Sequence, residues 1–103
     1  MNMKKQENML YDALSSYGKY TDKQIKIICF LVEHAIDNKI YPAVKKISEK
    51  TGVVTPTVYA SLRALKIDGI VTECQTQRDM LIINEEKIKF IEKFYEQIQS
   101  KSL

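Results

Sequence analysis

Residues 41–71 read YPAVKKISEKTGVVTPTVYASLRALKIDGIV, and this stretch determines the fold expected for the whole chain. Pro42 suits the first position of a helix, because its missing N–H would be unpaired there and its φ is already helical. Val44 and Ile47 lie three residues apart, on one face of that helix. Gly52 follows, and a glycine in the left-handed conformation would end the helix. The first half of the stretch therefore predicts a short helix and a tight turn.

A second helix begins directly after this turn. Thr55 can act as its N-cap and Pro56 as its first residue. One apolar stripe recurs along it at i, i+4 and i+7 and consists of Val58, Leu62 and Leu65. Two short helices joined by a glycine turn are the core of a helix-turn-helix, which we assign to residues 41–68.

The side of the second helix opposite this stripe is predicted to be small and polar. A solvated helix face usually carries long charged residues, whereas small residues allow the backbone to approach the edges of DNA bases. The small residues on this side are Thr57, Ala60, Ser61 and Ala64. Arg63 could reach a guanine or a phosphate, while Lys66 and Tyr59 would flank the DNA backbone. The alternative is a merely solvated helix in a protein-interaction domain.

Gly69 should end the second helix, and a β-hairpin is expected after it. Two short β-branched or apolar runs, 70–74 and 80–84, flank a polar segment. The tip of the hairpin would carry Gln77 and Arg78. A hairpin directly after a recognition helix is a wing, and wings commonly lay a basic residue along the phosphates or into the minor groove.

The run AVKKISEKTGVVTPTVYASLRALKIDGIV resembles the DNA-binding core of winged helix-turn-helix regulators of the MarR, PadR and ArsR type. The resemblance rests on the serine and glycine of the first half, the threonine-valine pair early in the second helix, and the leucine and glycine before the wing. It implies a winged helix-turn-helix fold with Arg78 in the wing. It also implies that five residues face DNA, namely Thr55, Thr57, Ala60, Ser61 and Arg63.

A narrower likeness concerns the start of the second helix. The sequence PTVYA at 56–60, the length of 103 residues and a closing helix are similar to the small centromere-binding adaptors of tubulin-like plasmid partition systems. Those proteins are winged-helix dimers that coat repeated DNA sites and hand the DNA to a filament-forming GTPase. This likeness implies a second function beside that of a repressor.

Two helices are expected before the helix-turn-helix. The first covers about residues 6–17 and ends at Gly18, and the segment at Thr21 is a candidate capping box that opens a second helix reaching about residue 37. That second helix is apolar nearly all round, so it must be buried on more than one face and is expected to be the central scaffold. Its apolar residues are Ile25, Ile27, Ile28, Cys29, Phe30, Leu31, Val32 and Ile36.

A last helix is expected over residues 85–100. Asn84 can cap it, and Glu85 and Glu86 are favourably placed in its first turn. Its apolar arc is wide for a monomer to cover, so we weigh ordinary core packing against a dimer interface shared with the N-terminal helices. A two-fold dimer would present two recognition helices to half-sites about 34 Å apart. The expected interface residues are Leu10, Leu14, Ile88, Ile91, Phe94, Tyr95 and Ile98.

The sequence thus predicts one mainly α domain over residues 1–103 with a small β-hairpin, a winged helix-turn-helix in the order α-α-(β)-α-α-β-β-α, where the strand in parentheses is optional. Its parts are scaffold helices at 1–38, the helix-turn-helix at 41–68, the wing at 70–84 and a dimerisation helix at 85–100. The net charge is +3, yet residues 43–67 alone carry +4, so the rest of the chain carries −1. We therefore add Lys45 and Lys46 to the expected DNA contacts.

Catalysis is not expected from this composition. His34 is the only histidine, and the cysteines Cys29 and Cys74 show neither metal-ligand spacing nor a secreted disulfide pattern, so no metal or cofactor is expected. The few glycines are isolated, which excludes a phosphate-binding loop. No signal peptide or membrane-spanning run is visible, and reduced cysteines fit a cytoplasmic protein.

The sequence therefore favours a homodimeric protein that binds double-stranded DNA in a sequence-specific way, most simply a small transcriptional repressor that occludes RNA polymerase. The partition adaptor, which would also bind a filament-forming GTPase, is the second hypothesis. A winged-helix interaction module that never touches DNA is the third.

Overall fold

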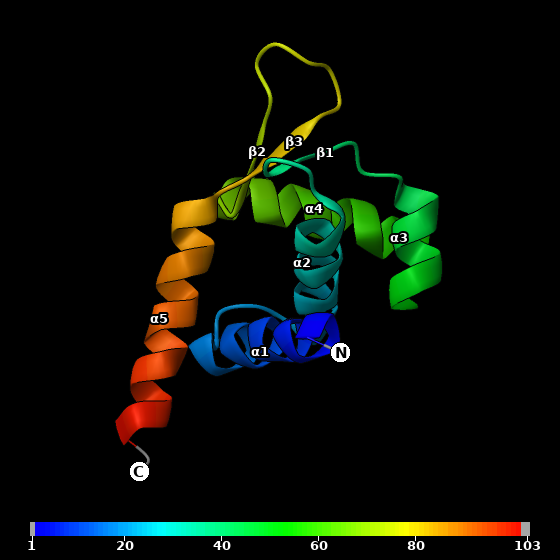
Figure 1. Cartoon of the computed structure of the whole chain (residues 1–103). Coiled ribbons are helices and arrows are strands. Elements are labelled where there is room, and N and C mark those ends of the chain that lie inside the picture. The colour runs from blue at the N-terminus through cyan, green and yellow to red at the C-terminus, as the bar shows by residue number, and fades with distance from the viewer. Residues whose placement is uncertain (1, 102–103) are drawn as a thin grey trace.

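The computed structural model describes the backbone of residues 2–101 and the side chains of residues 9–101. The chain is mainly helical, with a small three-stranded antiparallel sheet (Figure 1). This confirms the expected order of elements and includes the optional strand. The elements are α1 (Asn2–Tyr17), α2 (Asp22–His34), β1 (Lys39–Ile40), α3 (Val44–Thr51), α4 (Thr55–Asp68), β2 (Val71–Glu73), β3 (Leu81–Ile83) and α5 (Glu85–Lys101).

The helix α2 lies at the centre of the molecule. It contacts α1, α3 and α4, and Figure 1 shows it between α4 above and α1 below. As its apolar pattern predicts, α2 is buried on more than one face, because Ile27 and Ile28 are both almost fully covered although they are adjacent on the helix. Its other buried side chains are Ile25, Phe30 and Leu31. The helix is therefore the scaffold on which the other helices are placed.

Several helix ends follow the sequence signals closely. Thr21 forms the expected capping box at the start of α2. Gly52 and Gly69 end α3 and α4 in the left-handed conformation, with φ of 76° and 92°, which a side chain would strain. At the start of α5, the Asn84 side chain accepts the backbone N–H of Lys87 at 3.2 Å. These signals are local, which is why they could be read from the sequence.

The end of α2 was predicted wrongly. The helix stops at His34 and does not reach residue 37. Asp37 and Asn38 take left-handed backbone conformations, which these residue types tolerate, and Ile36 and Lys39 exchange backbone hydrogen bonds of 3.0 Å across them. The chain therefore reverses in a tight turn that leads directly into β1.

The starts of α3 and α4 also differ slightly from the prediction. Pro42 is not the first residue of α3, because Ala43 is the extended N-cap and the helix begins at Val44. In α4 the N-cap is Val54, one residue before the predicted Thr55, and no side chain caps the helix. Both helices nevertheless lie where the helix-turn-helix pattern placed them.

The sheet is built around its middle strand, β3. β1 and β2 pair with β3 on either side, both antiparallel, so that Val71 lies opposite Ile83 and Glu73 opposite Leu81. The hairpin strands are shorter than the predicted runs 70–74 and 80–84. Val71, Leu81 and Ile83 are buried in the core, while the tip of the hairpin projects away from the body of the molecule (Figure 1).

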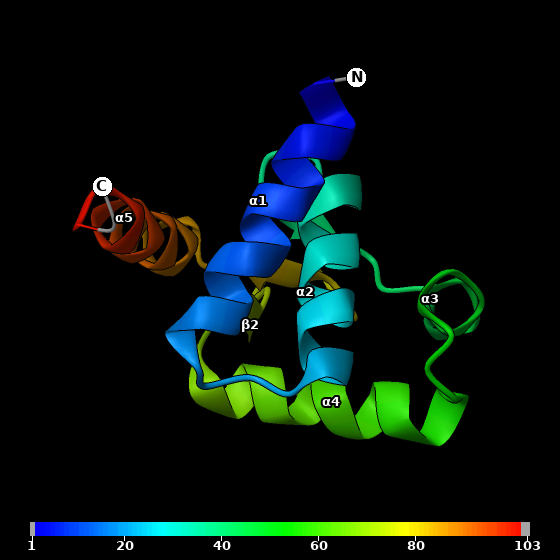
Figure 2. The ribbon, with the colours of Figure 1, turned by 90° about the horizontal axis from the view of Figure 1, so that it is seen from below.

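The helix α5 lies beside α1, which it contacts extensively (Figure 2). Its last turns extend beyond the rest of the molecule (Figure 1). Among the helices within residues 2–101, none is both long enough and apolar enough to cross a membrane.

Candidate nucleic-acid interface

The helix α4 has one covered side and one open side. Val58, Leu62 and Leu65 are buried, which confirms the predicted stripe. The open side carries most of the residues expected to contact DNA. Thr55, Tyr59, Ala60, Arg63 and Lys66 are exposed and Thr57 is half-buried.

Ser61 was assigned to the open side wrongly. Only 6% of its surface is exposed. Ser61 follows Val58 by three residues and precedes Leu65 by four, so it lies on the same side as the buried stripe. It is therefore part of the packing of α4 and not of a reading surface.

The open side is also less polar than expected. Ile67 is 83% exposed and Tyr59 is 55% exposed, and Val54 just before the helix is exposed as well. The expectation of a small and polar face was therefore wrong. The helical period places Ile67 opposite the stripe, and the structure shows that no element with described side chains covers it.

A groove of about 420 Å³ separates α4 from the hairpin. Residues of α4 and of the hairpin line it, together with Pro42 and Val44 around the start of α3. Across the groove, the Lys66 ammonium lies 3.5 Å from a carboxylate oxygen of Glu73. The lining residues are Pro42, Val44, Tyr59, Leu62, Arg63, Lys66, Glu73, Asp79 and Leu81. The groove thus joins the open side of α4 to the hairpin in one continuous surface.

The tip of the hairpin exposes Gln77 and Arg78. The tip contains no glycine, and Asp79 supplies the left-handed residue of the turn, with φ of 62°. The hydroxyl of Tyr41 donates a hydrogen bond to the side-chain carbonyl of Gln77. The tip is therefore tied to the segment before α3, on the same side of the molecule as the groove.

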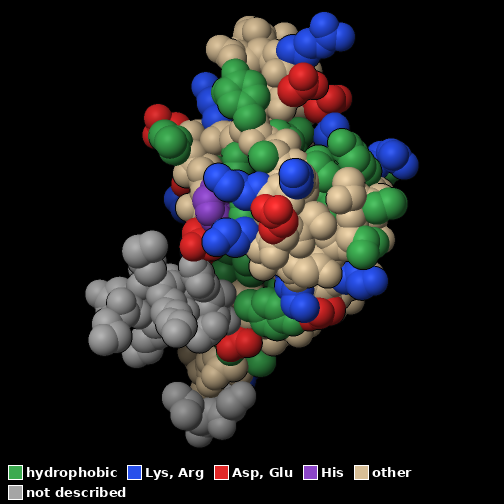
Figure 3. Space-filling model, turned by 90° about the vertical axis from the view of Figure 1, so that its right-hand side faces the viewer, with side chains coloured by type: hydrophobic (Ala, Val, Ile, Leu, Met, Phe, Trp, Pro, Cys, Tyr) green, Lys and Arg blue, Asp and Glu red, His purple; other side chains and the backbone are tan. Residues whose placement is uncertain are grey.

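Positive charge at this surface is mixed with other side chains. Lys45 and Lys46 of α3 are exposed. On the side of the molecule that carries α3, lysine and arginine side chains alternate with carboxylates and hydrophobic groups (Figure 3). The carboxylates of Glu73 and Asp79 line the groove itself. The +4 surplus of the sequence therefore does not produce an uninterrupted basic patch.

Four of the predicted interface residues lie in the core of the single chain. Leu10, Leu14, Ile88 and Ile91 are all at most 7% exposed. Their assignment to a dimer interface was wrong because α1 and α5 cover one another within the monomer. The sequence indicates that α1 and α5 each have an apolar face, but it does not indicate that these two faces pack against each other.

The outer half of α5 is different. Phe90 is 60% exposed, and Phe94 and Ile98 are also exposed, so they form a stripe at i, i+4 and i+8. Tyr17 of α1 packs edge-on against both phenylalanine rings, with ring centres 6.3 and 5.6 Å away. Tyr95, the remaining predicted residue, is half-buried against the core. The exposed apolar surface of α5 is therefore narrower than predicted and is centred on Phe94.

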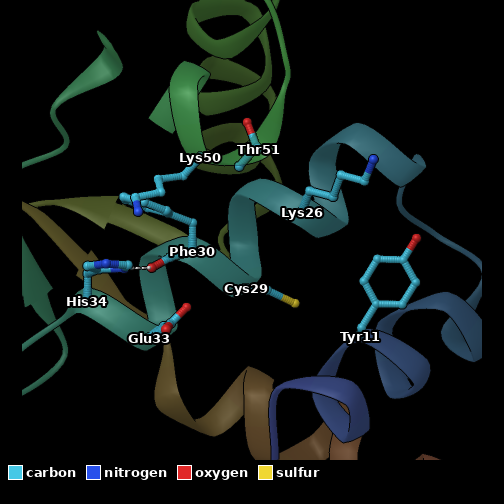
Figure 4. A pocket seen from close by; sticks show the side chains of 8 residues that line it. All are labelled: Tyr11, Lys26, Cys29, Phe30, Glu33, His34, Lys50 and Thr51. Carbon is cyan, nitrogen blue, oxygen red and sulfur yellow. Dashed lines mark hydrogen bonds between the residues drawn. The ribbon is translucent and has the colours of Figure 1, made fainter. Parts of the chain in front are cut away.

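A second groove, of about 470 Å³, lies between α1, α2 and α3 (Figure 4). His34 and Cys29 both line it, but Figure 4 shows them pointing in different directions from α2. One ring nitrogen of His34, Nδ1, lies 2.9 Å from the carbonyl oxygen of Phe30, and the two rings stack. Among the described side chains, no group of three or more His, Cys, Asp or Glu residues could hold a metal ion.

The exposed residues assigned to the candidate interface come from three segments of the chain. α3 contributes Lys45 and Lys46, α4 contributes the open side with Arg63, and the hairpin contributes Gln77 and Arg78. Comparison of the chain with models of protein families, with curated proteins and with solved structures finds no match.

Proposed function

We propose that this chain binds double-stranded DNA in a sequence-specific way, as a winged helix-turn-helix in which α4 is the recognition helix and the β2–β3 hairpin is the wing. The observation that carries the proposal is the open side of α4, which lies across a groove from an exposed hairpin. A helix-turn-helix with an adjoining hairpin presents these two elements to neighbouring grooves of DNA.

The recognition helix has suitable dimensions and side chains for the major groove. With 14 residues, α4 is about 21 Å long, and the major groove is about 12 Å wide. Ala60 would allow close approach to the base edges, and Arg63 would donate to a guanine. Tyr59 and Ile67 would place apolar surface against thymine methyl groups.

Contacts to phosphates would hold this helix in register. Lys45 and Lys46 on α3 and Arg78 at the tip of the wing are exposed cations on segments that flank α4. Gln77 beside Arg78 would donate to a phosphate or sugar. The carboxylate of Glu73 is paired with Lys66, which reduces its repulsion of the DNA backbone.

We further propose that the protein acts as a homodimer through the outer half of α5. Phe90 lies four residues before Phe94, and Ile98 lies four residues after it. If two copies of α5 pack antiparallel with their Phe94 rings in contact, Phe90 of each copy would lie against Ile98 of the other. The same arrangement brings Glu86 of one copy close to Lys101 of the other. Antiparallel helices also place opposite dipole ends together, which favours this pairing. The stripe is thus complementary to itself.

The molecular mass in solution tests this pairing. We expect Phe94→Ser to give a folded monomer, because Phe94 is exposed and is not one of the buried core residues, although its ring touches that of Tyr17. Glu96→Ser, at an exposed position on the same helix, is the matched control and should leave the dimer intact. A dimer of unchanged mass in Phe94→Ser would remove α5 from the interface.

Within this function we propose a repressor that occludes RNA polymerase at its site. One observation favours a different role, that of a protein-interaction module, because Val54, Tyr59 and Ile67 expose apolar surface on and beside α4. A partition adaptor would share the DNA contacts and would in addition bind a filament-forming GTPase.

Selection of bound fragments from the DNA of the host, followed by footprinting of the selected regions, tests the proposed function. One protected inverted repeat supports the repressor. A long tandem array of protected sites supports the partition adaptor. If no fragment is enriched and no specific protection is found, the chain does not read DNA, and the interaction module replaces the proposal.

A further inference from the structure

The last residue of α4, Asp68, lies in a cluster of polar side chains away from the proposed reading surface. Its side chain is only 11% exposed. The ammonium groups of Lys19 and Lys87 lie 2.5 and 3.2 Å from its two carboxylate oxygens, and the Tyr20 hydroxyl donates to it at 2.7 Å. These partners come from the α1–α2 turn and from α5. One carboxylate therefore connects three segments that are far apart in the sequence, and we call these four residues the Asp68 cluster.

Backbone groups strengthen the connection between α4 and α5. The Lys87 ammonium also donates to the backbone carbonyl of Asp68 at 2.9 Å. The Asn84 side chain donates to the carbonyl of Gly69 at 3.1 Å, while its own carbonyl accepts the Lys87 N–H. The last carbonyls of a helix lack partners within the helix, and here the first turn of α5 supplies partners at the end of α4. The end of α4 and the beginning of α5 are thus docked directly.

The ionised form of Asp68 is the one that this cluster holds. Burial acts to raise the pKa of Asp68, but hydrogen bonds from Lys19, Tyr20 and Lys87 outweigh it and lower the pKa below its ordinary value. Burial and the bond to Asp68 raise the pKa of Tyr20, which therefore stays a hydrogen-bond donor. Charge-assisted bonds are directional, so a carboxylate with these partners restrains the geometry of the segments that it joins.

We infer that the Asp68 cluster sets the orientation of α5 relative to the recognition helix, and thereby the spacing of the two half-sites that a dimer reads. The 17-residue α5 is about 25 Å long, so a swing of about 10° at its first turn moves its last turn by about 4 Å. That displacement exceeds the rise of one base pair, about 3.4 Å. Asp68 and Lys87 are thus positioning residues for half-site spacing. This inference rests on the proposed function of α4 and α5.

Two variants and one control test the inference. Asp68→Asn removes the charge at constant shape, and Lys87→Gln removes its partner on α5 should the first variant fail to fold. Lys89→Gln is the matched control, since Lys89 lies on the same helix and its ion pair, at 3.9 Å, is with exposed Glu85 and not with another segment. Backbone residual dipolar couplings of the full-length protein in solution report the orientation of α5 relative to α4.

We expect the couplings of α5 to change relative to those of α4 in both variants and to stay as in the parent in Lys89→Gln. On selected DNA with the half-site spacing varied by single base pairs, the parent should prefer one spacing. Both variants should lose that preference by at least about 5-fold while binding a single half-site within about 2-fold of the parent. The inference would be overturned if Asp68→Asn and Lys87→Gln fold but keep the residual dipolar couplings of the parent, or keep its preference for one half-site spacing. A parent that binds no half-site would instead overturn the proposed function.

Discussion

The helices α2 and α4 are nearly equal in length, 13 and 14 residues, but they are covered very differently. α2 is covered on more than one face by α1, α3 and α4, whereas α4 is covered on one side and leaves Ile67 and Tyr59 exposed on the other. A helix enclosed by its own chain serves as scaffold. A helix that keeps large side chains exposed has a side available for a partner, and the proposed function assigns that side of α4 to DNA.

The largest expected effect is on stability, where substitutions in the two helices should differ sharply. Ile27 in α2 is fully buried, so Ile27→Ala should lower the free energy of unfolding by about 2 to 5 kcal/mol. Ile67→Ala in α4 should change it by no more than about 0.5 kcal/mol, because Ile67 is exposed. Urea denaturation measures both. Equal losses in the two variants would show that the open side of α4 is covered in solution.

For DNA binding, in contrast to stability, the substitution in α4 is expected to have a larger effect than the substitution in α2. Arg63→Ala in α4 should weaken binding to the selected site by about 1 to 3 kcal/mol if Arg63 touches a base, with the free energy of unfolding unchanged. Lys23→Ala in α2 removes a charge of the same sign at an exposed position and serves as control. Titration of labelled DNA measures both affinities. Parental affinity in Arg63→Ala would show that the reading side of α4 is wrongly assigned.

A smaller effect is expected at the hairpin tip. Arg78→Gln should weaken binding to all DNA sequences alike and reduce the steepness of the salt dependence by about 0.9 in a double-logarithmic plot, because a phosphate contact is lost. Affinities measured over a range of salt concentrations give this slope. Lys23→Gln, at an exposed position of α2, should keep the parental slope. An unchanged slope in Arg78→Gln would remove the tip from the phosphate contacts.

The smallest expected effect concerns pH. The pKa of Asp68 is lower in the folded protein than its ordinary value of 3.8, so its ionised form contributes stability above that value, and the contribution is lost as pH falls through the folded pKa. The difference in unfolding free energy between the parent and Asp68→Asn should therefore be constant near neutral pH and shrink below about pH 4. Urea denaturation at several pH values measures it. A difference that grows on acidification would contradict the ionised cluster.

The sequence was sufficient to predict features that depend on neighbouring residues. Gly52 and Gly69 end helices because a left-handed residue is needed there, and the Thr21 box begins one because its partner is three residues away. The stripe of Val58 on α4 follows from the helical period alone. Each of these signals lies within one or two turns of the chain, so no knowledge of the tertiary structure was required.

Features that depend on distant segments could not be predicted. Leu14 and Ile91 looked available for a second copy because periodicity shows that a face is apolar but not which element covers it. The Asp68 cluster joins residues up to 68 positions apart along the chain, from Lys19 to Lys87. One local signal existed, since a carboxylate at the end of a helix opposes the helix dipole and therefore needs partners.

Chemical shift mapping by NMR can locate the DNA-binding surface, which we propose to be the open side of α4. On titration with the selected DNA, we expect the NMR signals of the backbone amides of Thr55, Tyr59, Ala60 and Arg63 to shift together with those of Gln77 and Arg78. The signals of the buried amides of α2 should stay in place. Shifts confined to α5, or no saturable shift with any DNA, would contradict the claim.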